Sequence, residues 1–378
     1  MVPLLGRTDP RPDAFYKSVF TAARDYNPAV KDPQPTDVLI VGAGPIGLEL
    51  AVCLKDAGVD YLHLDAGQVG QTIDWYPKQV SFFSSPERIA IAGVPLVTPD
   101  QTKATREQYL AYLHGVAEQF DLAVRAFEPV TAVRRDEAAG RFEVKSTKQT
   151  YHAQRVVLAI GDMHHPRELG IPGEDLPHVS HYFDEPQRFF RQDLLIVGGK
   201  NSAVEAALRC ARAGARVSIS YRQSWFDENA IKYWLTPEIK ALIDHGRIGY
   251  HPRTVPAAIT PGATTLADVD APGQTRSVPA DFVLLLTGYT QDKSLFESAG
   301  VALVGENRAP QHDPATMMTG VEGLYVAGTA AAGTQERFSL YIENAHPHVA
   351  KIVASITGSA PKPGLVNAAA QTYGLAES

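Results

Sequence analysis

The chain has 378 residues, of which 44% are apolar and 20% are charged, and its formal net charge is −7 at pH 7. This length predicts two or three domains. The acidic balance, without any Lys/Arg run, argues against nucleic acid as the main partner. No apolar run approaches the roughly 20 residues that cross a bilayer. Charged residues at 7, 9, 11 and 13 stand where a signal peptide needs its apolar core. We therefore expect a cytoplasmic globular protein without a membrane partner.

A glycine-rich turn follows the first strongly apolar run, residues 37–41. Gly42, Gly44 and Gly47 complete a G-x-G-x-x-G pattern, and a helical stretch and a second apolar run follow, so the segment predicts a βαβ unit. The amino terminus of such a helix offers free N–H groups and a positive dipole end to a diphosphate. Asp65 ends the second run, where a carboxylate accepts hydrogen bonds from ribose hydroxyls and repels a 2′-phosphate. We interpret this unit as an FAD site.

The same pattern recurs 156 residues later (198 − 42 = 156), where residues 193–197 precede Gly198 and Gly199. Lys200 and Ala203 replace two glycines, and the second strand ends at Arg222 instead of an acid. A guanidinium can hold a 2′-phosphate through two charge-assisted hydrogen bonds, worth about 1.5–3 kcal/mol. This unit predicts an NADPH site, with Lys200 directed away from the turn or toward the phosphates. Two adjacent dinucleotide sites predict electron transfer between them.

Further elements are expected between and beyond the two units. An aromatic and hydroxyl-rich loop, residues 71–86, is expected at the carboxyl edge of the first sheet, where ligands bind. We predict a helix and alternating strands, followed by three buried strands that end in glycine turns, over residues 106–120, 123–133, 141–146, 156–162, 282–289 and 323–329. A helix after the last turn would direct its amino terminus at the flavin ring.

The predicted fold class is α/β, with two Rossmann-like, three-layer ββα dinucleotide-binding domains. Residues 1–36 are assigned to an N-terminal extension that contains one amphipathic helix, with Phe15 and Val19 on its apolar face. Residues 37–166 and 291–378 are assigned to a discontinuous FAD-binding domain, and residues 167–290 to an NADPH-binding domain.

The two cysteines, Cys53 and Cys210, each lie in the predicted helix of one βαβ unit, where a small buried residue is expected. No C-x-x-C pair is present. A dithiol therefore cannot relay electrons inside this chain, and the electrons must leave the flavin directly.

These features resemble the pyridine-nucleotide flavoproteins of the thioredoxin-reductase type, and more narrowly their bacillithiol-disulfide reductase branch, which lacks the C-x-x-C. The resemblance extends from Asp37 to about Ile356, and it is carried by the stretches 82–85, 171–183, 198–203, 231–232, 287–289 and 342–344. It implies FAD and NADPH as cofactors, a small disulfide as substrate, and a homodimer or higher homo-oligomer.

The motifs and the resemblance together predict the site residues. FAD contacts are expected at Gly42, Gly44, Pro45, Gly47, Asp65, Gln71, Phe83, Ser84, Val130, Gly161, Gly328, Thr329, Glu343 and Asn344. NADPH contacts are expected at Gly198, Gly199, Lys200, Asn201, Ser202, Ala203, Arg222 and Gly288. No metal ligands are predicted.

The chain departs from the family pattern at three places. Many members carry a cysteine where this chain has Ile46, and a mechanism that needs that thiol cannot operate here. Thr329 stands where flavoproteins usually carry the acid that holds the ribityl chain, so a hydroxyl takes its place. The region from Thr334 to Leu340 is longer and more charged than the resemblance leads us to expect.

The favoured hypothesis is NADPH-dependent reduction of a small thiol disulfide, with bacillithiol disulfide implied by the resemblance. A leaving thiolate needs a proton, and His346 and His348 are candidate donors because imidazole exchanges protons near neutral pH. The alternative for both is a histidine at a helix end or on the surface. His164 and His165 follow the turn at Gly161, and a structural or hinge role is favoured for them.

Two other enzyme classes stay open. One is an electron-transfer reductase for ferredoxin or a quinone, although the net charge of −7 does not favour docking to an acidic ferredoxin. The other is a flavin monooxygenase, since His181 matches the histidine of F-x-G-x-x-x-H, but Asp175 and Pro177 fill the Phe and Gly places. A non-enzymatic FAD-binding module would leave the NADPH motif unexplained.

Overall fold

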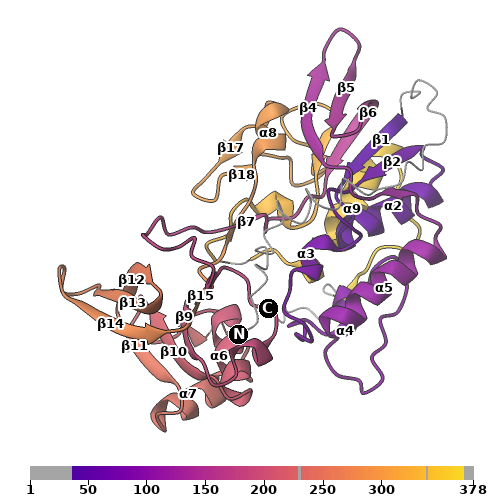
Figure 1. Cartoon of the computed structure of the whole chain (residues 1–378). Helices are drawn as coiled ribbons and strands as arrows, with labels where there is room; N and C mark the ends of the chain where they lie inside the picture. Colours follow the sequence, from indigo (N-terminus) through magenta and orange to yellow (C-terminus); the bar gives the residue numbers. More distant parts are fainter. Residues whose placement is uncertain (1–35, 229–230, 338, 370–378) are drawn as a thin grey trace, which may run out of the picture.

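The structure is a computed structural model that describes residues 36–228, 231–337 and 339–369 (Figure 1). The predicted N-terminal helix with Phe15 and Val19 lies outside the described residues. The strands form two α/β units, the second inserted into the first; we call the described residues of 36–166 and 291–369 the first unit and those of 167–290 the second unit. In Figure 1 the first unit is at the upper right and the second at the lower left.

The first unit is built on a seven-stranded sheet in the order β3-β2-β1-β6-β5-β4, in which β19 also pairs with β6. Its strands are β1 (Thr36–Val41), β2 (Tyr61–Leu64), β3 (Val124–Arg125), β4 (Val130–Asp136), β5 (Arg141–Ser146), β6 (Thr150–Leu158) and β19 (Leu324–Val326). Strand β6 is antiparallel to β5 in its first half and parallel to β1 and β19 near its end. The C-terminal segment thus returns to the first sheet.

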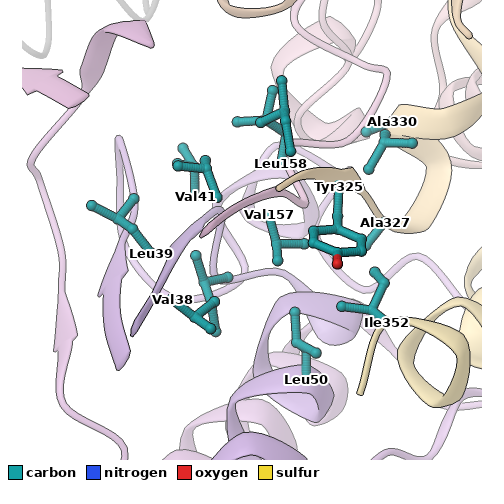
Figure 2. Packing of buried hydrophobic residues seen from close by; sticks show 14 of the residues in the cluster. Val38, Leu39, Val41, Leu50, Val157, Leu158, Tyr325, Ala327, Ala330 and Ile352 are labelled. Carbon is teal, nitrogen blue, oxygen red and sulfur yellow. The ribbon is translucent and has the colours of Figure 1, made fainter. Parts of the chain in front are cut away.

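Helices cover this sheet, and their apolar side chains pack with those of the strands to form the core. They are α2 (Pro45–Asp56), α3 (Gln71–Asp74), α4 (Pro86–Ile89), α5 (Arg106–Gln119), α8 (Ser294–Ser298) and α9 (Ile342–Thr357), with a 3₁₀ helix at Gly328–Ala332. A sheet buried on both faces needs nearly continuous apolar strands, and β1 and the end of β6 meet this need. Figure 2 shows their side chains gathered with those of β19, α2 and α9, among them Val38, Leu50, Val157, Tyr325 and Ile352.

The second unit has three layers. Its central sheet has the order β11-β10-β9-β15-β8 and is formed by β8 (Val179–Ser180), β9 (Asp193–Val197), β10 (Arg216–Tyr221), β11 (Gly249–Pro252) and β15 (Phe282–Leu285). One face packs on α6 (Asn201–Arg212), next to α7 (Thr236–Asp244) and a 3₁₀ helix at Pro186–Phe189. The other face packs on an antiparallel sheet of β12 (Thr254–Thr260), β13 (Gly262–Asp268) and β14 (Thr275–Ala280).

Two short strands mark the places where the chain passes between the units. β7 (His165–Pro166) pairs antiparallel with β16 (Tyr289–Thr290). A second small pair, β17 (Leu303–Val304) and β18 (Ala309–Pro310), lies in the returning segment. Within the described residues, no helix combines the length and the apolar character that a membrane crossing requires.

The structure corrects two sequence-based boundaries. The strand expected over 123–133 is divided into β3 and β4, because Phe127 adopts a positive φ of 53° and Pro129 has no N–H to donate. The strand expected from residue 156 begins earlier, at Thr150, because its first half pairs with β5.

Candidate dinucleotide-binding cleft

A cleft of about 1840 Å³ separates the two units, and both glycine loops lie in its wall. Pockets for one small ligand typically measure about 300–1,000 Å³. The cleft therefore has room for more than one ligand, and it exposes both predicted nucleotide sites to a common space.

The first glycine loop fits the approach of a diphosphate. Gly42 has a φ of 108°, and a Cβ there would collide with the carbonyl oxygen of Ala159. A Cβ on Gly47 would collide with the carbonyl oxygen of Gly42. A Cβ on Gly44 would meet no protein atom within 4 Å, and Gly44 lines the cleft. Packing therefore requires glycine at 42 and 47, whereas at 44 its absent side chain leaves space open for a ligand.

Asp65 joins the end of β2 to this loop. Its Oδ2 accepts a hydrogen bond from the Ala43 N–H at 2.5 Å, and its Oδ1 accepts one from the Gly67 N–H at 2.7 Å. Burial raises the pKa of Asp65, and the two backbone hydrogen bonds act in the opposite direction. Each carboxylate oxygen retains a second lone pair, and Asp65 lines the cleft, so the group can also accept from ribose hydroxyls.

The second glycine loop, between β9 and α6, has the same arrangement as the first. Gly198 has a φ of 141°, and a Cβ there would collide with the carbonyl oxygen of Leu286. Lys200 is the N-cap of α6, whose first turn carries no acidic residue. Arg222 is exposed directly after β10 and lines the same cleft. A helix N-terminus flanked by two cations fits a phosphorylated nucleotide.

Most predicted cofactor residues line the cleft. On the first side these are Gly42, Gly44, Pro45, Asp65, Gln71, Phe83, Ser84, Val130, Gly161, Gly328 and Thr329, and on the second side Gly198, Gly199, Lys200, Asn201, Ser202, Arg222 and Gly288. Four do not: Gly47, Ala203, Glu343 and Asn344. Gly47 and Ala203 lie behind their loops. Glu343 is fully buried, and the Asn344 side chain accepts from the Tyr341 N–H at 2.8 Å, which caps α9.

The two candidate proton donors, His346 and His348, are also outside the cleft lining. His346 is only 1% exposed, with Nδ1 at 2.7 Å from Glu49 Oε2 and Nε2 at 3.0 Å from the Arg88 carbonyl oxygen. Burial lowers the pKa of His348 to about 4. His164 does line the cleft, but burial lowers its pKa to about 4, and its Nδ1 accepts from the Asp292 N–H. We therefore do not retain His346 and His348 as catalytic candidates.

The structure adds polar cleft residues to which the sequence analysis gave no role. Asp162 is buried, its carboxyl accepts from Gln335 Nε2 at 2.9 Å, and burial raises its pKa. Its position directly after the Gly161 turn is a sequence feature from which it could have been predicted.

Lys232 donates to Glu205 Oε2 and to the Ser81 carbonyl oxygen, each at 2.9 Å, and so connects the two units. No spacing rule joins residues 81, 205 and 232.

The cysteines lie in the cores of different units. Cys53 in α2 is 1% exposed and Cys210 in α6 is fully buried. Burial raises the pKa of both thiols to about 12. Because a thiolate is the reactive form, neither cysteine is set up to receive electrons from a ligand in the cleft.

Comparison with known proteins identifies the family. The family model described as pyridine nucleotide-disulphide oxidoreductase matches residues 39–328. The bacilliredoxin reductase Bdr of Bacillus subtilis is 36% identical over 318 residues, which cover 84% of this chain and 96% of that protein. A ferredoxin–NADP reductase of Ignicoccus hospitalis is 28% identical over 302 residues, covering 77% of this chain and 89% of that protein.

A solved structure agrees with these relatives. The bacillithiol disulfide reductase Bdr of Staphylococcus aureus has a TM-score of 0.80 and 34% identity, and the match covers 86% of this chain and 99% of that one. The two glycine loops, open on the cleft side at Gly44 and at the N-terminus of α6, fit the two dinucleotides of such enzymes. The chain is an oxidoreductase that uses FAD and NADPH. It belongs to the pyridine nucleotide-disulphide oxidoreductase family.

Proposed function

We propose that this enzyme reduces a small thiol disulfide of the bacillithiol disulfide type with NADPH, without a cysteine relay. In the balanced reaction, NADPH and one proton convert one disulfide into two thiols and NADP⁺, with transfer of two electrons. FAD, when bound, carries these electrons from the nucleotide to the disulfide.

The observation that carries the proposal is that both cysteines are buried in the cores of the two units and neither lines the cleft. With Cys53 in α2 and Cys210 in α6, each unit keeps its one thiol in its own core. The acceptor must then reach the cleft itself, which favours a small molecule. The similarity to a bacilliredoxin reductase and to a bacillithiol disulfide reductase supports this substrate class.

The residues of the cleft receive the following roles in the proposal. The N-terminus of α2 and the open space at Gly44 hold the FAD diphosphate, and Asp65 accepts from its ribose. The N-terminus of α6 with Lys200 holds the NADPH diphosphate, and Arg222 pairs with the 2′-phosphate.

The activity is tested with a panel of electron acceptors under anaerobic conditions. NADPH oxidation is expected to proceed through many turnovers with bacillithiol disulfide and to release two thiols per NADPH. Ferredoxin, a quinone and oxygen are compared at equal enzyme concentration. The measurements are nucleotide absorbance and thiol titration.

A different outcome would select another function. Sustained turnover with ferredoxin or the quinone, together with a single flavin reduction and no turnover with the disulfide, would contradict the proposal. The similarity to a ferredoxin–NADP reductase is the reason to include that acceptor.

Replacing Arg222 by Ala is expected to raise the KM for NADPH about 10- to 100-fold, because two charge-assisted hydrogen bonds to a phosphate are worth about 1.5–3 kcal/mol. The KM for NADH should stay unchanged. Steady-state turnover rates, measured at varied concentrations of NADPH and of NADH, give both KM values. Arg247→Ala is the matched control, since Arg247 is exposed in the same unit but does not line the cleft. An equal loss with NADH would contradict the assignment of the 2′-phosphate to Arg222.

We further propose that the enzyme works in the cytoplasm as a homodimer or higher homo-oligomer. Two unpaired cysteines suit a reducing compartment. Light scattering of the purified flavoprotein tests the oligomeric state, and a monomer would contradict it.

A further inference from the structure

The charged segment after β19 extends from the first unit toward the second. Hydrogen bonds hold the start of this segment in place: the Thr334 hydroxyl accepts from the Gln291 N–H and from Lys293 Nζ. The Gln335 side chain accepts from the N–H groups of Ser339 and Leu340 and donates to Asp162. Glu336 and Arg337 are exposed between these fixed points and line the cleft.

Glu336 holds two cations at once. Its backbone carbonyl oxygen accepts from Lys200 Nζ at 2.6 Å. Its carboxylate accepts from Arg167 Nη2, also at 2.6 Å. Lys200 is the N-cap of α6, and Arg167 directly follows β7. Glu336, a residue of the first unit, therefore binds two cationic side chains of the second unit beside the second glycine loop.

More positive charge surrounds this contact. The pKa of Glu336 is lowered, first by its hydrogen bond to Arg167 and further by the charges of Lys200 and Arg222. The pKa of Lys200 is lowered, first by burial, with Arg167, Arg222 and Arg337 adding to the effect. Three cations, Arg167, Lys200 and Arg222, thus act on the Glu336 carboxylate, and Arg337 adds positive charge near Lys200.

Arg167 also has unused donor capacity. Its Nε atom is buried and has no hydrogen-bond partner among the described residues. A buried guanidinium N–H without a partner is uncommon in native proteins. A group with several acceptor oxygens would satisfy this atom together with Nη2, which a carboxylate on Nη2 alone does not.

We propose that Glu336 is an internal competitor for the nucleotide phosphates, and that it occupies a subsite formed by Arg167 and Lys200, with the charge of Arg222 beside it. This inference rests on the proposed NADPH site at α6. A nucleotide phosphate that enters the subsite replaces the Glu336 carboxylate on Arg167 and the Glu336 carbonyl on Lys200. The residue thereby determines how tightly NADPH and NADP⁺ are held.

The expected change in nucleotide affinity is small because Glu336 and its cationic partners are partly exposed to solvent. Ion pairs at this degree of exposure each contribute little, so removing the competing carboxylate is expected to tighten binding of phosphorylated nucleotides about three- to tenfold. The gain should shrink in about 1 M salt, where the screening length falls to about 3 Å.

The test measures NADP⁺ and adenosine 2′,5′-bisphosphate binding to the oxidised FAD-loaded enzyme by calorimetry, which needs no turnover. Glu336→Gln is compared with wild type and with Glu322→Gln. Glu322 is exposed in the same C-terminal segment but precedes β19, at the opposite end of the strand from the cleft. Tighter binding of both ligands by Glu336→Gln, with Glu322→Gln equal to wild type, is the expected result.

Unchanged or weaker binding by Glu336→Gln overturns the inference, since the carboxylate would then be inert or would help to place Arg167. Equal tightening by both variants also overturns it, because a general charge effect would explain the gain. The wild-type titration tests the proposed NADPH site separately: a holoenzyme that binds neither ligand contradicts that site itself.

Discussion

Replacing Gly42 by Ala is expected to yield a colourless protein with a lowered unfolding temperature. Gly42 has a φ of 108°, and the added Cβ would collide with the backbone carbonyl of Ala159. Both residues follow neighbouring central strands, β1 and β6, so the strands must separate to make room. Backbone strain and overpacking together cost about 2–5 kcal/mol. Thermal unfolding of the FAD-free protein and the flavin absorbance after reconstitution measure the two effects.

Gly44→Ala is the matched control for this prediction. Gly44 has an ordinary φ of −74°, and its Cβ would meet no protein atom within 4 Å. The FAD-free variant should therefore unfold at the wild-type temperature, while FAD affinity falls about tenfold or more because a methyl group blocks the close approach of the diphosphate. Wild-type FAD affinity in Gly44→Ala would contradict the placement of the first cofactor at this loop.

Replacing His346 by Ala is expected to lower the free energy of unfolding by about 2–4 kcal/mol, because the buried Glu49 carboxyl group and the Arg88 carbonyl oxygen each lose a hydrogen-bond partner. Both ring nitrogens face acceptors, Glu49 Oε2 and the Arg88 carbonyl oxygen. The ring therefore lies between two oxygen atoms, one of them on the fully buried Glu49. Without it, the donors to the Glu49 carboxyl group among the described residues are the N–H groups of Ala92 and Asn367. Denaturant unfolding measures the loss.

Turnover separates a structural from a catalytic role for this histidine. Since His346 does not line the cleft, kcat per folded, FAD-loaded enzyme should be unchanged. Glu49→Gln keeps an acceptor for the two backbone N–H groups and a donor for a neutral imidazole, so its cost should be only about 1 kcal/mol. His348→Ala should be milder than His346→Ala, because His348 is half-buried. A His346→Ala variant that is fully stable but inactive would restore it as a catalytic candidate.

The nucleotide loops were predictable from sequence because their requirements are local. Strand, glycine turn, helix and terminal charge follow one another within about 25 residues, in the order that a βαβ unit imposes. The placement of Gly42, Asp65, Gly198 and Arg222 at the carboxyl ends of their strands follows from that order, and the structure has this arrangement.

Features that depend on distant partners were not predictable. His346 follows the first turn of α9, which the sequence directs at the cofactor, but its partners Glu49 and Arg88 are 297 and 258 positions away. The sequence did not decide whether the Lys200 side chain points away from the turn or toward the phosphates. Its hydrogen-bond partner, the Glu336 carbonyl oxygen, comes from the other unit. The β12–β14 sheet was also missed, because its strands are stabilised by packing on β9 and β15 and not by a strong local pattern.

The return of β19 to the first sheet has a consequence for biosynthesis. The strands of the two sheets of the second unit lie between residues 179 and 285, so this unit can fold as soon as that stretch leaves the ribosome. The first sheet still lacks β19 at that stage, and Glu49 still lacks His346 and the Asn367 N–H. Loading of FAD is therefore expected only after residues 324–367 have left the ribosome, and a nascent chain can present a finished second unit before it can acquire its colour.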